Sequence, residues 1–273
     1  MTNQQEHHIR QIVASSVEIF ARTFADRHLQ EVDCDGGVIN QKIHNIFIAV
    51  LGKDIQYYSA LARSLDSSLG NMLEKMAVCI ASINYRVSKH VEGVLYKAQT
   101  DFIAELLESY KNTKGSHHRQ PSISDYGEIT RITSDSESQI KRHESDYCLL
   151  DEETGIHYLI ELKIGGDLDN KKARSEKEAL LEQYCILSNT LGSSENVKIY
   201  FATAYNRFGE GVPWRQGRVR QFFADDELLI SRDFWNFICK SQDGYEIVID
   251  AYKRNAYHIV NALDAIKAAY LDD

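Results

Sequence analysis

Residues 144–172 read ESDYCLLDEETGIHYLIELKIGGDLDNKK, and the first half of this stretch predicts a β-hairpin. Two short apolar runs, 146–150 and 157–162, flank the polar segment 151–156. Apolar and aromatic runs that are separated by a glycine-containing turn of this length are typical of two antiparallel strands. We therefore expect this hairpin to form part of a sheet.

The hairpin also predicts which polar groups come together. If Leu150 pairs with His157, the antiparallel register places Asp146 opposite Glu161. Side chains alternate along a strand, so Glu161 and Lys163 share one face of the sheet. Two carboxylates and one ammonium group would then meet at one end of the sheet.

Such a group of side chains suits phosphodiester hydrolysis. Mg²⁺ prefers oxygen ligands, usually one or two carboxylates with water and phosphate oxygens. The bound ion lowers the pKa of a water ligand, and a lysine nearby orients that water or the phosphate. The alternative is a solvated surface pair, since Glu-x-Lys is a common sequence. An apolar strand that ends in charged residues, as 158–163 does, favours the nuclease. The residues by themselves leave both interpretations open.

Ser145-Asp146, followed after the turn by Glu161-Leu162-Lys163, resembles the PD-(D/E)xK signature of the restriction-endonuclease-like superfamily. Ser145 stands where the signature usually has proline, a departure that many members share. The resemblance implies Asp146, Glu161 and Lys163 as catalytic residues and Mg²⁺ as the cofactor. It also implies Asp146, Glu161 and Leu162 as the metal ligands. Asp125 and Asp135 are rival first carboxylates, but neither begins an apolar run.

A narrower resemblance concerns residues 165–177, GGDLDNKKARSEK. This segment resembles the type II restriction endonucleases grouped with TdeIII. The likeness implies a short GC-rich palindrome, such as GGNCC, as the recognition site.

The first 110 residues carry apolar stripes at helical spacing, and such stripes are typical of a core or a subunit interface. We expect residues 1–110 to form a helical region that packs on a catalytic core of residues 111–273, within one structural domain, and that supplies a dimer contact or embraces DNA. Glu92, on the last expected helix, is a candidate extra acid of the kind that some superfamily members carry before the hairpin. A solvated helix residue is the alternative. The stripes are Ile9, Ile12, Val13, Phe20 and Phe24; Leu69, Met72, Leu73, Met76, Ile80 and Ile83; and Val87, Val91, Leu95, Ala98, Phe102 and Leu106.

A helix is expected after the hairpin, capped by Asp169 and ended by Gly192. Its first turns carry Lys171, Lys172 and Arg174, although basic residues oppose the helix dipole there. A bound DNA phosphate would resolve that conflict, because the first amides of a helix favour an anion. Solvation of the three side chains is the alternative.

Residues 196–205 predict a further strand, which leads into a loop rich in glycine and arginine. Arginine reads guanine bidentately in the major groove, and glutamine or asparagine reads adenine. A basic surface loop is the alternative interpretation. Helices are expected near residues 233–239 and 254–270. The candidate DNA-binding residues of the loop are Asn206, Arg207, Arg215, Gln216, Arg218 and Arg220.

Composition limits the remaining possibilities. The chain has 273 residues and a formal charge of −9, which argues against a protein that coats nucleic acid without specificity. The five cysteines are scattered without Cys-x-x-Cys spacing, which favours a reducing cytoplasm over a disulfide framework or a zinc site. No apolar stretch is long enough to cross a membrane, and the polar start is not a signal peptide.

Together these patterns predict an α/β fold with a restriction-endonuclease-like core, a mixed sheet flanked by helices, and a helical N-terminal region. The function expected is that of a Mg²⁺-dependent type II restriction endonuclease, which cuts double-stranded DNA as a homodimer and has a DNA methyltransferase as its genetic partner. One alternative is a repair or recombination nuclease of the same fold that acts on DNA structure. The other is a non-catalytic helical interaction protein.

Overall fold

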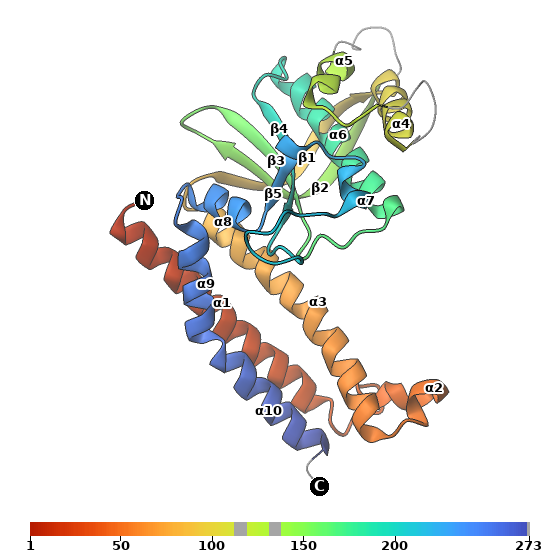
Figure 1. Ribbon diagram of the computed structural model, residues 1–273, viewed down its shortest axis with the longest axis vertical. Coiled ribbons are helices and arrows are strands. Elements are labelled where there is room, and N and C mark those ends of the chain that lie inside the picture. Colours follow the sequence, from red (N-terminus) through yellow and green to blue (C-terminus); the bar gives the residue numbers. More distant parts are fainter. Residues whose placement is uncertain (112–118, 131–137, 272–273) are drawn as a thin grey trace. The chain divides into compact units, whose positions relative to one another are not determined.

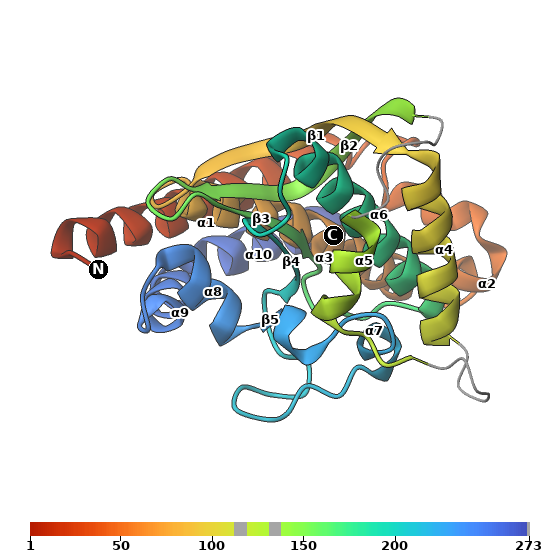
Figure 2. The same ribbon diagram turned by 90° about the horizontal axis from the view of Figure 1, so that it is seen from above.

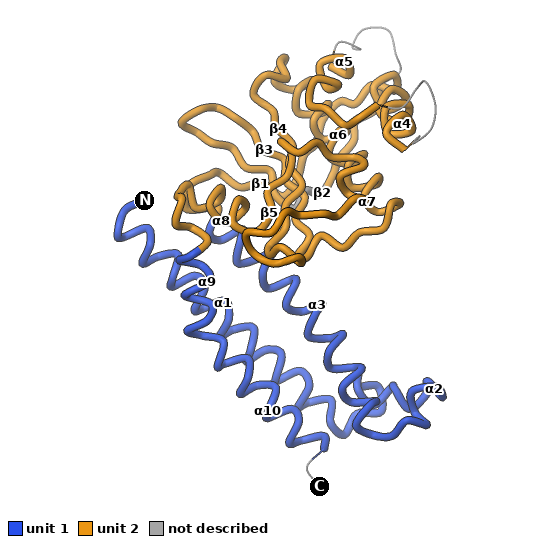
Figure 3. The backbone as a smooth tube through the Cα atoms, in the orientation of Figure 1, with its two compact units in different colours: residues 1–80, 246–273 blue, residues 81–245 orange. Residues whose placement is uncertain are grey.

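The computed structural model describes residues 1–111, 119–130 and 138–271, apart from the side chains of residues 144–146. The chain folds into two compact units (Figure 3). Unit 1 comprises Met1–Ile80 and Glu246–Asp273, and unit 2 comprises Ala81–Tyr245. The last helices of the chain therefore join the first ones in unit 1.

Unit 2 is built on a five-stranded mixed sheet (Figure 1), which confirms the expected α/β class. The strand order follows the sequence, with antiparallel pairing of the first three strands and parallel pairing of the last three. The strands are β1 (Arg86–Tyr96), β2 (Ser138–Asp151), β3 (Ile156–Leu162), β4 (Val197–Thr203) and β5 (Leu228–Ile230).

The hairpin β2–β3 has the register that the sequence predicts. Leu150 pairs with His157, and pairing runs on to Tyr147 and Ile160. The next backbone positions in that register are those of Asp146 and Glu161. Gly155 closes the turn with φ +71°, a left-handed conformation that favours glycine.

Helices cover both faces of this sheet. On one face, α6 (Asn170–Leu191) joins β3 to the parallel strand β4 and lies with α4 (Lys97–Lys111) and α5 (Tyr126–Thr130) (Figures 1 and 2). Cys148 and Leu159 belong to the core beneath α6. On the other face, Tyr158 packs against Phe237 of α8 (Arg232–Cys239), with ring centroids 4.9 Å apart. The short helices η2 (Ile123–Asp125), α7 (Gly217–Arg220) and η3 (Asp225–Glu227) complete unit 2.

The expectation of a helix over residues 86–96 is wrong, because these residues form strand β1. Val87, Val91 and Leu95 are four positions apart, a spacing that fits one side of a helix and also one face of a strand. The burial along β1 alternates, with Val91 and Leu95 buried and Glu92 exposed. Gly93 lets this strand approach α6 closely, since a Cβ atom there would lie 2.9 Å from Thr190 Oγ1.

Unit 1 is helical in its described residues. Helices α1 and α10 lie side by side (Figure 1), and Tyr270 donates a hydrogen bond of 3.1 Å to the carbonyl of His28. Arg10 of α1 forms an ion pair of 2.5 Å with Asp250 of α9. The first two apolar stripes are core positions in part. Their buried members are Ile9, Val13, Phe20, Phe24, Met72, Met76 and Ile80, while Ile12, Leu69 and Leu73 are partly buried and Ile83 lies beyond the end of α3. The elements are α1 (Asn3–Gln30), η1 (Asn40–His44), α2 (Ile46–Ala49), α3 (Lys53–Ala81), α9 (Gly244–Asn255) and α10 (Tyr257–Leu271).

Within the described ranges, no helix is both long and apolar enough to cross a membrane. All five cysteines are free thiols, two of them exposed and three buried.

Candidate active site

Glu161 and Lys163 lie together at the carboxyl end of β3. Glu161 is 9% exposed and follows Leu159 at the strand alternation, so it faces α6. Lys163 comes directly after the strand, and its backbone N–H donates to the carbonyl of Ala202 on β4 at 3.0 Å. The Lys163 ammonium group forms an ion pair with the Glu161 carboxylate. The sheet thus holds this acid and this base on one face, as the sequence predicts.

A second carboxylate reaches the same lysine from α6. Oε1 of Glu176 lies 3.2 Å from Lys163 Nζ, and both side chains are partly buried. Glu176 is not among the residues that the sequence predicts for the site. A signal was present, because Glu176 is three positions after Ala173 and four before Leu180, two buried residues of α6. An acid on the buried side of a helix needs a partner.

The carboxylates of Glu161 and Glu176 are groups that could bind a metal cation. Among the described side chains, the carboxylates of Glu161 and Glu176 both contact the Lys163 ammonium group in a partly buried position. Carboxylate oxygens are the ligands that Mg²⁺ prefers. Leu162 lies between Glu161 and Lys163 with its side chain fully buried, so the group it can offer to a metal is its main-chain carbonyl.

Asp146 belongs to β2, but its side chain is outside the described part of the structure. The side chains that are described include no group of three histidine, cysteine or acidic residues arranged around a metal position. Glu161 and Glu176 are thus the two acids that the described side chains bring to Lys163. Of the rival first carboxylates, Asp135 lies outside the described residues and Asp125 is paired elsewhere in the fold.

Glu92 lies apart from these residues. Its strand neighbours Val91 and Leu95 face the core beneath α6, so Glu92 points to the other face of the sheet. Its carboxylate is 57% exposed and lies 3.9 Å from Arg142 of β2. The acid that the structure adds beside Lys163 comes from the helix after the hairpin and is Glu176.

The start of α6 has the predicted caps. Asp169 accepts a hydrogen bond from the backbone N–H of Lys172 at 2.8 Å, and Gly192 ends the helix with φ +72°. Lys171 and Lys172 are exposed in the first turn, and Arg174 is partly buried. In the sequence, these three basic residues come shortly after Lys163.

The remaining DNA-binding candidates lie in the segment between β4 and the end of α7, and their contacts divide them into two groups. Four of them have contacts within the protein. Arg207 and Gln216 contact Asp167 at 2.6 and 3.2 Å, Asn206 donates to the carbonyl of Val212 at 2.6 Å, and Arg220 pairs with Asp225 at 2.5 Å. The other two, Arg215 and Arg218, are exposed and have no ion-pair partner among the described side chains.

A buried cluster of polar side chains also fixes α6. Lys177 is fully buried, and its Nζ lies 2.5 Å from the Glu227 carboxylate and contacts the Tyr126 hydroxyl. Burial lowers the pKa of Lys177 well below its usual value and raises the pKa of Glu227 to about 8. Next to this cluster, Asp125 accepts from the Tyr110 hydroxyl at 2.6 Å. These groups are not accessible to a substrate, and they join α4, α5, α6 and η3.

A second buried acid of α6 faces the sheet. The Glu182 carboxylate forms an ion pair with Lys141 of β2, and Nε2 of His143 on the same strand lies 2.8 Å away. Burial would raise the pKa of Glu182, but hydrogen bonds from these two groups outweigh it and the pKa is lowered. Glu182 therefore holds the middle of α6 on β2.

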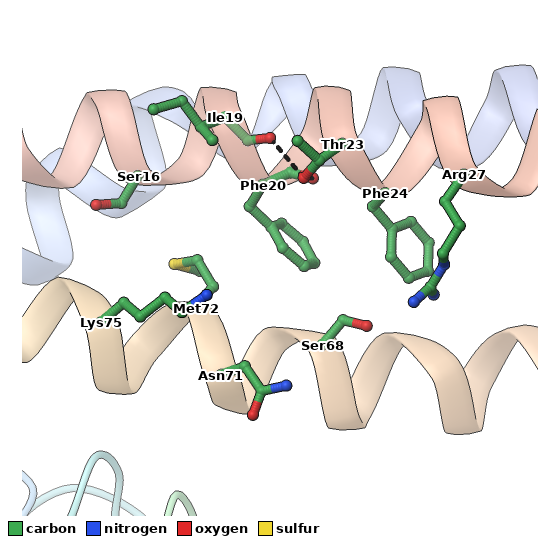
Figure 4. A pocket seen from close by; sticks show the side chains of 10 residues that line it. All are labelled: Ser16, Ile19, Phe20, Thr23, Phe24, Arg27, Ser68, Asn71, Met72 and Lys75. Atoms are coloured by element: carbon green, nitrogen blue, oxygen red, sulfur yellow. Dashed lines mark hydrogen bonds between the residues drawn. The ribbon is translucent and has the colours of Figure 1, made fainter. Parts of the chain in front are cut away.

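Unit 1 contains a cleft of about 480 Å³ between α1 and α3 (Figure 4). Phe20, Phe24 and Met72 form its apolar lining, and Arg27 and Lys75 lie among its polar groups. No histidine, cysteine or acid is among its lining residues, so it lacks the groups of a metal or hydrolytic site. It suits a contact with another protein surface better than catalysis.

Comparison with known proteins places these features in a family. A family model described as "Type II restriction endonuclease, HinfI" matches residues 1–256. No curated protein matches the chain. The match covers the hairpin, α6 and the loop after β4, together with most of unit 1.

Proposed function

Because the chain belongs to the HinfI family of type II restriction endonucleases, we propose that it cuts double-stranded DNA at a short palindromic site with the help of Mg²⁺. The observation that carries this proposal is the contact of Lys163 with Glu161 at the carboxyl end of β3. Ligands commonly bind at the carboxyl ends of strands in sheets of this kind. The family itself makes the chain a site-specific deoxyribonuclease.

We assign the metal to Asp146, Glu161 and the main-chain carbonyl of Leu162. When bound, Mg²⁺ would supply Lewis-acid stabilisation of the charge that develops on the phosphate. The buried Glu161 carboxylate and the Glu176 carboxylate beside Lys163 support this assignment. Asp146 directly precedes Tyr147, which pairs with Ile160 next to Glu161, and this proximity along the strands supports its inclusion.

Lys163 acts on the reacting groups in this proposal. Its ammonium group holds the attacking water or a phosphate oxygen by a charge-assisted hydrogen bond. Glu161 and Glu176 restrict the rotation of the lysine side chain from two sides. Glu176 is therefore a positioning residue for Lys163.

The DNA would be held by basic groups on both sides of this site. Lys171, Lys172 and Arg174 at the start of α6 are placed to bind phosphates, since the first amides of a helix also favour an anion. Arg215 and Arg218 are exposed, and a guanidinium group reads guanine bidentately. Asn206, Arg207, Gln216 and Arg220 complete the candidate DNA surface.

A palindromic site would be met by a two-fold homodimer, because each half-site then faces an identical protein surface. We propose the α1–α3 cleft of unit 1 as the subunit contact, since its apolar lining lacks catalytic groups. A cognate DNA methyltransferase would protect the host DNA in the cytoplasm. Analytical ultracentrifugation with and without DNA measures the oligomeric state.

Cleavage of plasmid DNA with Mg²⁺, with Ca²⁺ and with EDTA tests the proposed reaction. We expect discrete fragments with Mg²⁺ and intact plasmid with EDTA. Sequencing the fragment ends then gives the recognition site and the cut position, and compares the site with GGNCC. Random ends, or cutting governed by DNA structure, would contradict a sequence-specific enzyme. Intact plasmid under all conditions would contradict catalysis.

A further inference from the structure

We propose that Asp167 is a positioning residue for DNA recognition, whose carboxylate sets both ends of the loop of residues 207–216. This inference rests on the proposed function. Oδ1 of Asp167 lies 2.6 Å from an Arg207 guanidinium nitrogen and accepts a hydrogen bond of 3.2 Å from Gln216 Nε2. One oxygen atom thus contacts a residue at each end of the loop.

The position of Asp167 is itself tightly determined. A Cβ atom on Gly165 would lie 2.5 Å from the Tyr205 hydroxyl, and one on Gly166 would lie 2.9 Å from Trp214 Cζ2. Gly166 also has φ +65°. The glycine pair therefore passes closely beneath two aromatic side chains that flank the loop. Beyond Asp167, the cap of α6 at Asp169 fixes the chain in the other direction.

The middle of the loop has a separate attachment. The Glu210 carboxylate accepts a hydrogen bond of 2.7 Å from Ser231 Oγ and lies 3.2 Å from Arg232 Nε. Ser231 is buried and has φ 53°, a strained value for a residue with a side chain. Strain of this kind persists where the surroundings hold the backbone firmly, and it is common at functional sites. The Asp167 carboxylate thus holds the two ends of the loop, and the Glu210 carboxylate holds its middle.

With these contacts in place, several other side chains of the loop are exposed to solvent. Phe208 and Val212 are each 42% exposed, and Arg215 next to Gln216 is exposed. The Asp167 side chain is 65% exposed, so its charge is also felt by an approaching DNA backbone.

The carboxylate should have opposite effects on two kinds of DNA. On the cognate site, a preset loop binds more tightly because its ends need no ordering on contact. On any other duplex, the negative charge repels phosphates and occupies Arg207, which would otherwise bind a phosphate without regard to sequence. Loss of the charge should therefore weaken cognate binding and strengthen binding to unrelated DNA. A simple loss of folding would weaken both.

The experiment uses full-length Asp167→Asn, which keeps the shape of the side chain and removes its charge. The probes are a duplex that carries the site mapped from the cleavage ends and a duplex with that site scrambled, both in Ca²⁺. We expect cognate binding to weaken about tenfold, as for one disturbed base contact. Binding to the scrambled duplex should tighten, and its salt slope should steepen by about one. The kcat at saturating cognate DNA should stay near that of the wild type.

Two further variants serve as controls. Glu152→Gln removes the charge of an exposed carboxylate that is also paired with an arginine, Arg86, but lies at the turn end of the hairpin, away from Lys163. We expect it to leave the ratio of the two affinities unchanged. Adding Arg207→Ala to Asp167→Asn should reduce the gain on scrambled DNA, because Arg207 is the group released.

The outcomes separate this inference from the proposed function. An affinity ratio that Asp167→Asn leaves unchanged overturns the role of Asp167, as does the same change of ratio in Glu152→Gln. A gain on scrambled DNA that is equally large with Arg207→Ala also overturns it. Equal weakening on both duplexes with a lowered unfolding temperature assigns Asp167 to folding and overturns the proposal. A wild-type protein that makes no mapped cuts contradicts the proposed function instead.

Discussion

The Lys163 ammonium group lies 3.2 Å from the Glu176 carboxylate, although the two residues belong to different elements, the end of β3 and the second turn of α6. With Glu161 on the other side, the lysine is confined between two acids. A confined ammonium group loses less rotational freedom when it binds phosphate or water, which favours reaction. The geometry of α6 is therefore part of the proposed active site.

The first prediction concerns the metal ligands. Asp146→Ala and Glu161→Ala should abolish plasmid cleavage, because each removes a proposed ligand of Mg²⁺. Circular dichroism should show an intact fold, since Lys163 keeps Glu176 as an ion-pair partner when the Glu161 carboxylate is removed. Wild-type-like cleavage by either variant would refute the assignment. Lys163→Ala should inactivate the enzyme with a smaller loss of Ca²⁺ affinity, as measured by calorimetric titration.

The second prediction concerns Glu176. Glu176→Gln should lower kcat by roughly 10- to 100-fold, the usual range for removing a group that orients an active-site residue. Cognate DNA affinity in Ca²⁺ should change little, because Glu176 contacts Lys163 and not DNA in this proposal. Glu178→Gln, the same change on the same helix, is the matched control. Equal kcat values for the two variants would remove Glu176 from the site.

The third prediction concerns the buried pair of Lys177 and Glu227. Lys177→Met should lower the free energy of unfolding by about 3 kcal/mol, because it leaves a buried acid without its partner. The double variant Lys177→Met, Glu227→Leu should lose less, since no buried charge remains. Urea unfolding of the three chains measures both values. A double variant as unstable as Lys177→Met would show that packing, and not the unpaired acid, sets the cost.

The fourth prediction follows from the lowered pKa of Glu182. A carboxyl group whose pKa is lower in the folded chain stabilises the fold above its unfolded pKa. That stabilisation is lost as the pH falls through the folded pKa. Glu182→Gln should therefore be less stable than the wild type at neutral pH, and the difference should shrink below pH 4.5, the ordinary pKa of a glutamate side chain. Urea unfolding across this range checks the convergence. A difference that stays constant with pH would exclude the charge of Glu182 as its cause.

The hairpin was predictable because its pattern is local. Leu150 and His157 flank one turn, and the alternation of apolar and charged residues leaves one register that buries the right side chains. Strand β1 was not predictable in this way, because Val87, Val91 and Leu95 repeat at a spacing that a helix and a strand share. Local periodicity cannot separate the two where apolar residues recur every fourth position.

The contacts that α6 makes depend on the tertiary fold. Tyr126, Lys177 and Glu227 are far apart in the sequence and meet in one buried cluster. The caps of α6 were predictable, but the side on which each acid lies depends on the rotation of the helix against the sheet. The pairing of Glu176 with Lys163 therefore required the packed structure.

The last prediction concerns the exposed arginines of the loop. Arg215→Ala or Arg218→Ala should weaken cognate binding by about 1–3 kcal/mol if the arginine reads a base. If it binds a phosphate instead, cognate and scrambled duplexes should weaken alike, and the salt slope should fall by about one. Binding in Ca²⁺ at several salt concentrations separates these outcomes.

Arg86→Ala is the matched control for these variants. Arg86 is also exposed, but in the pairing of β1 with β2 it lies opposite Leu150, at the turn end of the hairpin. The turn is at the opposite end of β3 from Lys163. Removal of the Arg86 side chain should therefore change the binding of neither duplex. If Arg215→Ala and Arg218→Ala both behave like Arg86→Ala, the loop does not read DNA. The polar segment before Asp146 would then be the next candidate for the part of the chain that recognises the DNA sequence.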